Sequence, residues 1–230
     1  MQSLKLAFLV ILATALCSVS GVKVFDLAKT FQNFTCMKNL GYTHAIIRAY
    51  HSYGAIDTTA QDNIQRSNDA GLSTDVYMFP CRGKSASQQV NELVDYLESM
   101  MKIKGTPSAY TYATGTIWLD IETNPSPGCS WTVGTPETNC QYVKDLISVI
   151  SARGRSVGIY ASGYMWNQIM GSKNACKEFT QYPLWYAHYD GKASFDDWES
   201  NQFGGWTRPN MKQWAGSAIV CDYDVDLSYY

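Results

Sequence analysis

The chain has 230 residues, of which 20 are acidic and 18 are basic, so its formal net charge is −2. Charged residues make up 17% of the sequence, below the roughly 25% of an average protein. This weakly acidic balance argues against proteins that depend on long-range attraction to nucleic acid or to an anionic membrane.

Residues 1–20 have the pattern of a secretory signal peptide. Lys5 supplies a basic start, residues 6–17 form an apolar stretch, and Ser18-Val19-Ser20 is a small-x-small exit, although Cys17 could also end the signal. The apolar stretch is shorter than the roughly 18 residues of a membrane span. We therefore expect no membrane partner and a chain exported to the extracellular space or a gut lumen, with lysosome-like vesicles as an alternative route. Residues 21–230 are expected to form one monomeric domain.

Strand and helix patterns alternate along the mature chain. The first five predicted strands, at 22–27, 45–50, 74–80, 115–122 and 156–161, are each followed by a helical pattern, at 34–40, 58–70, 87–104, 142–153 and 164–170. Three further strands follow at 184–189, 211–214 and 225–229, separated by loops. Alternating strands and helices indicate parallel β-α-β units. We therefore predict an α/β fold, a TIM-like barrel of five β-α units followed by three β-strands, with a loop insertion at 123–136.

Six cysteines remain after signal cleavage: Cys36, Cys81, Cys129, Cys140, Cys176 and Cys221. An even number in an exported chain predicts three disulfides, for which the sequence allows 15 pairings. We favour Cys36 with Cys221, and Cys129 with Cys140 closing one loop. No metal site is expected, because C-x-x-C and H-x-x-x-H spacings are lacking. Asn33 begins an N-x-T sequon and is the predicted glycosylation site.

The fourth predicted strand ends in two acids, Asp120 and Glu122, which are two residues apart. Side chains alternate along a strand, so both acids point to the same face. Glycoside hydrolysis uses such a pair, with one group protonated and the other ionised. An isolated D-x-E can equally be two solvated carboxylates at an ordinary strand end. The residues at the other strand ends are therefore needed to distinguish a catalytic pair from solvated carboxylates.

The carboxyl ends of barrel strands form the active site in this class of fold. Here they carry polar and aromatic residues, as expected of a carbohydrate site, although aromatic core packing is the simpler explanation for any single tyrosine. The set is Arg48, Tyr50, Tyr77, Phe79, Asp120, Glu122, Tyr160, Trp185, Tyr186, His188, Gln213, Trp214 and Asp226.

Several of these runs resemble the lysozymes of glycoside hydrolase family 25, and in particular their nematode and amoeba branch. The runs are GVKV at 21–24, AIIRAY at 45–50, DVYMFP at 75–80, IWLDIE at 117–122, VGIY at 157–160, LWYAHY at 184–189 and VD at 225–226. The resemblance covers the mature chain in order. Chitinases of the family 18 type fit worse, because their D-x-x-D-x-D-x-E motif would need acids where this chain has Gly115 and Trp118.

The resemblance implies an N-acetylmuramidase that cuts bacterial peptidoglycan, in antibacterial defence or digestion, without a metal or organic cofactor. It implies that Glu122 is the general acid, that Asp120 orients the acetamido group of the sugar or stabilises positive charge, and that Asp226 is the acid of the last strand. Residues expected to bind substrate are Tyr77, Tyr160, Tyr186, Gln213, Arg48 and Tyr50.

One position departs from the family pattern. The family's first strand reads Gly-Val-Asp-Val, and this chain has Lys23 in place of the aspartate. A cation within about 4–6 Å of Glu122 would lower the pKa of its carboxyl group and impair proton donation. Asp26 could take over, although its opposite strand parity would then require a bulge, or Lys23 could swing outward. The two hypotheses are a muramidase with activity reduced by Lys23, and a catalytically silent glycan-binding or signalling protein on the same scaffold.

Overall fold

The computed structural model describes residues 21–102 and 114–230. The predicted signal peptide at 1–20 and the last two residues of the helix predicted at 87–104 lie outside these ranges. The described strands are β1 Lys23–Leu27, β2 Tyr42–His51, β3 Ala55–Ile56, β4 Ser73–Met78, β5 Thr114–Asp120, β6 Val157–Ala161, β7 Leu184–Ala187, β8 Met211–Val220 and β9 Tyr223–Tyr229. The helices are α1 Phe34–Asn39, α2 Ala60–Asp69, α3 Ala86–Lys102, α4 Pro136–Ala152, α5 Gly163–Met170 and α6 Trp198–Asn201.

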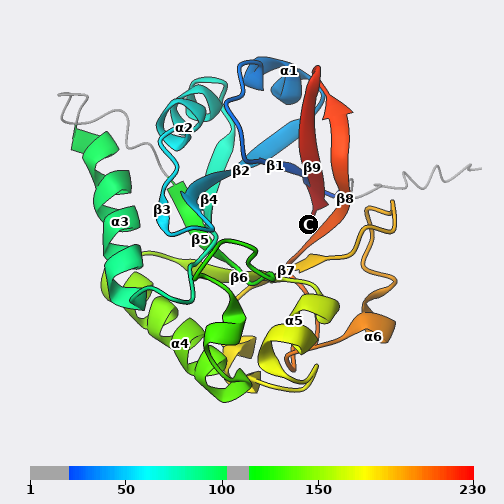
Figure 1. The fold of residues 1–230 in the computed structure, drawn as a ribbon. Coiled ribbons are helices and arrows are strands. Elements are labelled where there is room, and N and C mark those ends of the chain that lie inside the picture. Colours follow the sequence, from blue (N-terminus) through cyan, green and yellow to red (C-terminus); the bar gives the residue numbers. More distant parts are fainter. Residues whose placement is uncertain (1–20, 103–113) are drawn as a thin grey trace, which may run out of the picture.

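Eight of these strands close into a barrel, so the predicted α/β, TIM-like fold is confirmed (Figure 1). The order is β1-β9-β8-β7-β6-β5-β4-β2, and β1 pairs with β2 to close the ring. Neighbours are parallel except for β9, which runs antiparallel to both β8 and β1. The two-residue β3, which was not predicted, adds to β2 as a short antiparallel strand.

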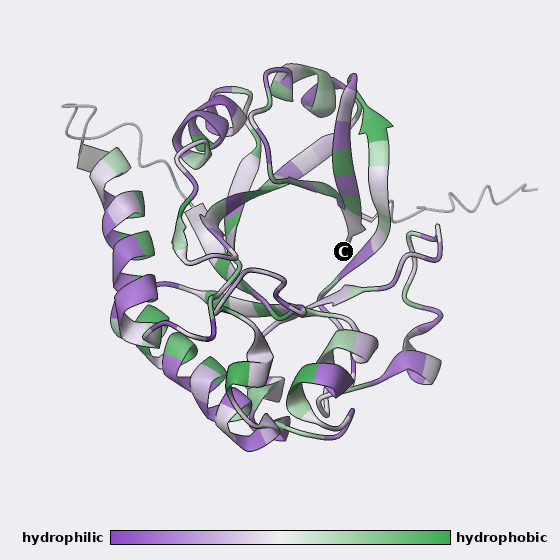
Figure 2. Ribbon diagram, viewed as in Figure 1, coloured by the Kyte–Doolittle hydropathy of each residue, from purple (hydrophilic) through white to green (hydrophobic). Residues whose placement is uncertain are grey.

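Two apolar layers hold the barrel together. The larger one lies between the outer face of the strands and the covering helices, where α3 and α4 mix hydrophobic and hydrophilic residues along their length (Figure 2). The smaller one fills the barrel interior and includes Val24, Ile46, Trp118 and Trp185. Gly158 makes room for this inner layer, because a Cβ atom there would lie 2.4 Å from the Trp118 indole.

Helix α4 begins earlier than the predicted residue 142. Thr135 caps it through a reciprocal pair of hydrogen bonds with Thr138, and Pro136 occupies the first turn, where its missing N–H costs nothing. This early start places Cys140 inside the helix, about one turn from its beginning.

The disulfides confirm one predicted pairing and correct the other. Cys36 pairs with Cys221, as expected. The predicted Cys129–Cys140 pair is wrong, because Cys129 bonds to Cys81 and Cys140 bonds to Cys176. The loop containing Cys129 packs on the segment after β4, where the Arg82 N–H donates to the Cys129 carbonyl at 3.1 Å.

No helix among the described residues is long and apolar enough to cross a membrane.

Candidate active site

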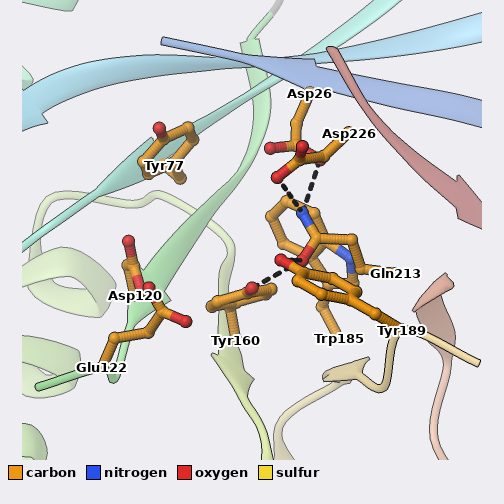
Figure 3. A pocket seen from close by; sticks show the side chains of 9 residues that line it. All are labelled: Asp26, Tyr77, Asp120, Glu122, Tyr160, Trp185, Tyr189, Gln213 and Asp226. Atoms are coloured by element: carbon orange, nitrogen blue, oxygen red, sulfur yellow. Dashed lines mark hydrogen bonds between the residues drawn. The ribbon is translucent and has the colours of Figure 1, made fainter. Parts of the chain in front are cut away.

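A pocket of about 370 Å³ opens at the carboxyl ends of the barrel strands. Its walls carry four carboxylic acids, four aromatic rings and one amide (Figure 3). The lining residues are Asp26, Tyr77, Asp120, Glu122, Tyr160, Trp185, Tyr189, Gln213 and Asp226. Small-molecule sites commonly combine aromatic rings with a few polar groups in this way.

Asp120 and Glu122 come from the end of β5, as the sequence predicts. Asp120 is the last residue of the strand and is 6% exposed, while Glu122 is partly buried just beyond it. The Trp131 indole N–H donates to the Glu122 carbonyl at 2.6 Å, which fixes the backbone that carries this acid. Oδ1 of Asp120 is buried and has no hydrogen-bond partner within the described part of the chain. A buried polar atom without a partner is costly, so Asp120 is placed to receive a donor from a ligand.

Asp226 and Asp26 form the opposite wall. They are direct partners across the antiparallel β1–β9 pair, and both point into the pocket (Figure 3). The backbone N–H of Ser217 donates to Asp226 Oδ1 at 2.7 Å. Asp26 is 7% exposed.

Gln213 on β8 connects the two aspartates to two tyrosines. Its Nε2 donates to Asp26 Oδ1 at 2.8 Å and to Asp226 Oδ2 at 3.4 Å. Its Oε1 accepts from the hydroxyls of Tyr160 and Tyr189. An amide oxygen can only accept, so both phenols must donate to it. Their oxygen lone pairs therefore remain available to a ligand or to a protonated acid in the pocket.

Burial raises the pKa values of all four acids, and repulsion from other acids of the pocket adds to the shift of Asp26, Asp120 and Glu122. For Asp120 and Asp26, burial is the main cause and the neighbouring carboxylates add to it. The pKa of Glu122 is raised by burial first and by the charge of Asp226 second. The pKa of Asp226 is raised mainly by burial. Repulsion between neighbouring carboxylates disfavours their joint ionisation, which favours a protonated acid beside an ionised one in the same pocket.

Lys23 lies outside this pocket. It is exposed, its ammonium lies 3.3 Å from the Leu40 carbonyl, and it sits 5.7 Å from the centre of the Tyr42 ring. Val24 belongs to the interior layer of the barrel, so Asp26 shares the inward face with it and Lys23 faces outward. Both alternatives offered for Lys23 therefore apply: Lys23 points outward, and Asp26 lines the pocket, with a register shift in the β1–β2 pairing between Lys23 and Val24.

Three of the predicted binding residues do not line the pocket. The β2–β4 register shifts between Arg48 and Tyr50, and Tyr50 packs outside the barrel with its hydroxyl donating to Glu92. Tyr186 also faces outward and donates to Asp197. Arg48 is held by Asp57 at 2.8 Å and by the Ala28 carbonyl at 2.7 Å, although its charge still lowers the pKa of Asp120, against the larger effect of burial.

The other predicted binding residues lie where expected, because Tyr77, Tyr160 and Gln213 all face the pocket. Three further residues line it that were given no catalytic or binding role. They are Asp26, considered only as a substitute, Trp185, named only as a strand-end residue, and Tyr189, which was not considered. Strand alternation could have found the last two, because residues 185, 187 and 189 fall on the same face.

The loop that carries Tyr189 is held by a buried cation, Lys212 on β8. The Lys212 side chain is 0% exposed and pairs with Asp190 at 2.8 Å and Asp197 at 2.7 Å. His188, Asp190 and Asp197 could together present ligand atoms to a metal ion. Both carboxylates already bind the Lys212 ammonium, so a metal ion would have to displace it.

Asn33, the predicted glycosylation site, is exposed at the start of α1. Its Oδ1 accepts from the Cys36 N–H at 3.2 Å and caps the helix.

Comparisons with known proteins agree with this geometry. Residues 21–214 match the family model described as Lysozyme-like protein 1. The chain is 38% identical over 216 residues to a probable GH family 25 lysozyme 2 of Dictyostelium discoideum, covering 93% of this chain and 91% of that protein. It is 32% identical over 198 residues to lysozyme-like protein 5 of Caenorhabditis elegans, covering 85% of this chain and 84% of that protein.

The fold is also found among solved structures. The bacterial lysozyme from Streptomyces coelicolor superposes with a TM-score of 0.71 at 24% identity, over 91% of this chain and 92% of that one.

Proposed function

Because the chain belongs to the lysozymes of glycoside hydrolase family 25, we propose that it is a secreted muramidase that hydrolyses the glycan strands of bacterial peptidoglycan. The observation that carries the proposal is the pocket at the barrel mouth, where four acids with raised pKa values face an aromatic wall. Glycoside hydrolysis needs a protonated acid and an ionised carboxylate around one sugar.

Glu122 is the proposed general acid. Burial and the charge of Asp226 raise its pKa and favour the protonated form, and that proton passes to the oxygen linking two sugars as the bond to the anomeric carbon breaks. Positive charge then develops on the anomeric carbon and the ring oxygen. The ionised members of the acid group stabilise this charge in a partly dehydrated pocket. Water adds to the anomeric carbon, and its released proton restores Glu122.

Asp120 is the proposed partner of the sugar's acetamido group. Its buried Oδ1 has no hydrogen-bond donor among the described residues, and an acetamido N–H would supply one. Tyr160 and Trp185, with ring centres 4.6 Å apart, form a wall on which the apolar face of a pyranose can rest. Asp26 and Asp226 stand on the opposite side, where ionisation of this pair supplies negative charge.

The alternative of a catalytically silent glycan-binding or signalling protein rested on Lys23. This residue lies on the outer face of β1 and contacts α1 and Tyr42, so it gives the alternative no support. The active enzyme is therefore the preferred proposal.

We extend the proposal to the export and domain organisation of the protein. Residues 1–20 act as a signal peptide, residues 21–230 form one monomeric domain, and Asn33 carries an N-linked glycan. Three disulfides among the described residues fit an oxidising compartment. The biological role is antibacterial defence or digestion.

The test is to identify the sugar ends that the protein releases from purified peptidoglycan. After borohydride reduction, a muramidase yields muramitol and a glucosaminidase yields glucosaminitol. We expect muramitol from the wild type, a loss of about 10²- to 10⁴-fold in Glu122→Gln, and wild-type rates in Glu199→Gln, a control on α6 outside the pocket. Absence of new ends with the wild type would refute the proposal.

A further inference from the structure

A second cavity adjoins the catalytic pocket. It has a volume of about 420 Å³ and shares Asp26, Tyr77 and Asp226 with the pocket. Its other walls come from residues 27–29 after β1 and from the β8–β9 hairpin. In Figure 3 the three shared residues form the side of the pocket away from Glu122. A ligand held in the pocket therefore has open space beside it, beyond the Asp26–Asp226 wall.

The chemistry of this side cavity differs from that of the catalytic pocket. Tyr77 is its only aromatic residue, and that ring is shared with the pocket. Lys29 is the one cation lining either cavity. The Lys29 side chain is exposed, and its ammonium has no hydrogen bond or ion pair with any described residue. A wall with so little ring surface is poorly suited to stack a further sugar.

The backbone of Lys29 is nevertheless fixed by a hydrogen bond. Its carbonyl accepts from the Asn63 side-chain amide at 2.9 Å, and Asn63 is 1% exposed. Asp224, which also lines the cavity, is an exposed acceptor close enough for its charge to raise the pKa of Asp226. A cavity lined by one cationic donor and by an anionic acceptor beyond the catalytic acids matches a chain of amides that ends in carboxylates.

The proposed function supplies a substituent with this chemistry. In peptidoglycan, every muramoyl sugar carries a short acidic peptide joined to the ring through a lactyl ether and an amide bond. We propose, resting on the muramidase function, that the side cavity receives the start of this peptide, with Lys29 binding a carboxylate or carbonyl oxygen and Asp224 an amide N–H. The cavity would then select peptide-bearing strands over bare glycan.

The test compares two soluble substrates: glycan strands with their peptides, and the same strands after an amidase has removed them. We expect Lys29→Gln to lower kcat/KM about three- to tenfold on the peptide-bearing strands, as for loss of a partly exposed charged contact, and to leave the bare strands within about twofold. Lys29→Arg keeps the charge and should keep the preference. Lys144→Gln, an exposed lysine on α4, is the control for charge removal. Equal losses on both substrates, or none on either, would overturn the inference.

A binding measurement separates this inference from the proposed function. Calorimetry with Glu122→Gln, and with the double variant that adds Lys29→Gln, measures affinity for both substrates without turnover. Tighter binding of peptide-bearing strands that disappears with Lys29 supports the side cavity even if the wild type cleaves nothing, a result that would refute only the muramidase proposal. Identical affinities for both strands would overturn the inference, whether or not the enzyme is active.

Discussion

Asp26→Asn and Lys23→Asp form a pair of substitutions that tests which residue of β1 serves the pocket. Asp26 is buried and faces the other acids, whereas Lys23 is exposed on the outer face of the same strand. In Asp26→Asn the amide oxygen can still accept from Gln213, whose Nε2 lies 2.8 Å from Asp26 Oδ1, so the change removes the ability of this side chain to ionise as positive charge develops and keeps its hydrogen bond.

The size of the effect follows from Coulomb's law. A carboxylate about 5 Å from a developing positive charge contributes about 3 kcal/mol at an effective dielectric constant of about 20, which corresponds to about two powers of ten in rate. We therefore expect Asp26→Asn to lower kcat/KM about 100-fold. Lys23→Asp should stay within about twofold, because its charge is exposed and screened by salt. Its cost is the contact with the Tyr42 ring, worth at most about 1 kcal/mol of folding stability.

The assay is the release of reducing ends from soluble peptidoglycan strands, with circular dichroism to confirm that both variants are folded. If Lys23→Asp raised activity tenfold or more while Asp26→Asn left it unchanged, position 23 would belong to the site and the β1 orientation described above would be wrong.

Three further predictions concern the acids and the buried cation. Asp226→Asn removes a charge that raises the pKa of Glu122, so the alkaline limb of the kcat/KM profile should move to lower pH; an unmoved limb would contradict this. Asp120 has a folded-state pKa well above its unfolded value, so it favours unfolding as pH rises through that range. Asp120→Asn should accordingly flatten the fall in unfolding free energy as the pH rises above the ordinary aspartate pKa, measured by urea titrations, and a curve parallel to wild type would count against it. Lys212→Met leaves Asp190 and Asp197 without their cation and should cost about 3–5 kcal/mol of unfolding free energy; a loss below about 1 kcal/mol would show that the pairs matter little.

The barrel could be predicted because periodicity along the chain reports it directly. The eight barrel strands and five of the helices are visible as alternating or helical patterns. The two-residue β3 and the four-residue α6 are too short to show a period. The start of α4 was missed because Pro136 resembles part of a loop, whereas the capping pair Thr135 and Thr138 makes it the first turn of the helix.

The site could be predicted only in part, because single-residue register decides which side chains enter the barrel. The two acids of β5 follow from their spacing. Tyr50 is turned outward by a register shift that no sequence pattern announces, and Tyr186 faces away because its neighbour Trp185 takes the inward position. For Asp26, the error lay in taking position 23 as an inward-facing position of the strand, because Val24 and Asp26 face the barrel interior.

The disulfide pairing could also be predicted only in part from the sequence. A pairing that closes a short loop is plausible from spacing alone, yet Cys140 lies on a helix and Cys129 lies beside the segment after β4. Three-dimensional proximity, which sequence spacing does not encode, selected the partners.

The most direct test of the whole account is the titration of Glu122 by carbon NMR of the labelled carboxyl groups, with the signal assigned through its loss in Glu122→Gln. We predict that the Glu122 carboxyl titrates above the ordinary glutamate pKa of 4.5, because burial and the charge of Asp226 raise its pKa. Titration of Glu122 at or below that ordinary value would contradict this prediction, because the pocket would then not favour the protonated form of its proposed general acid.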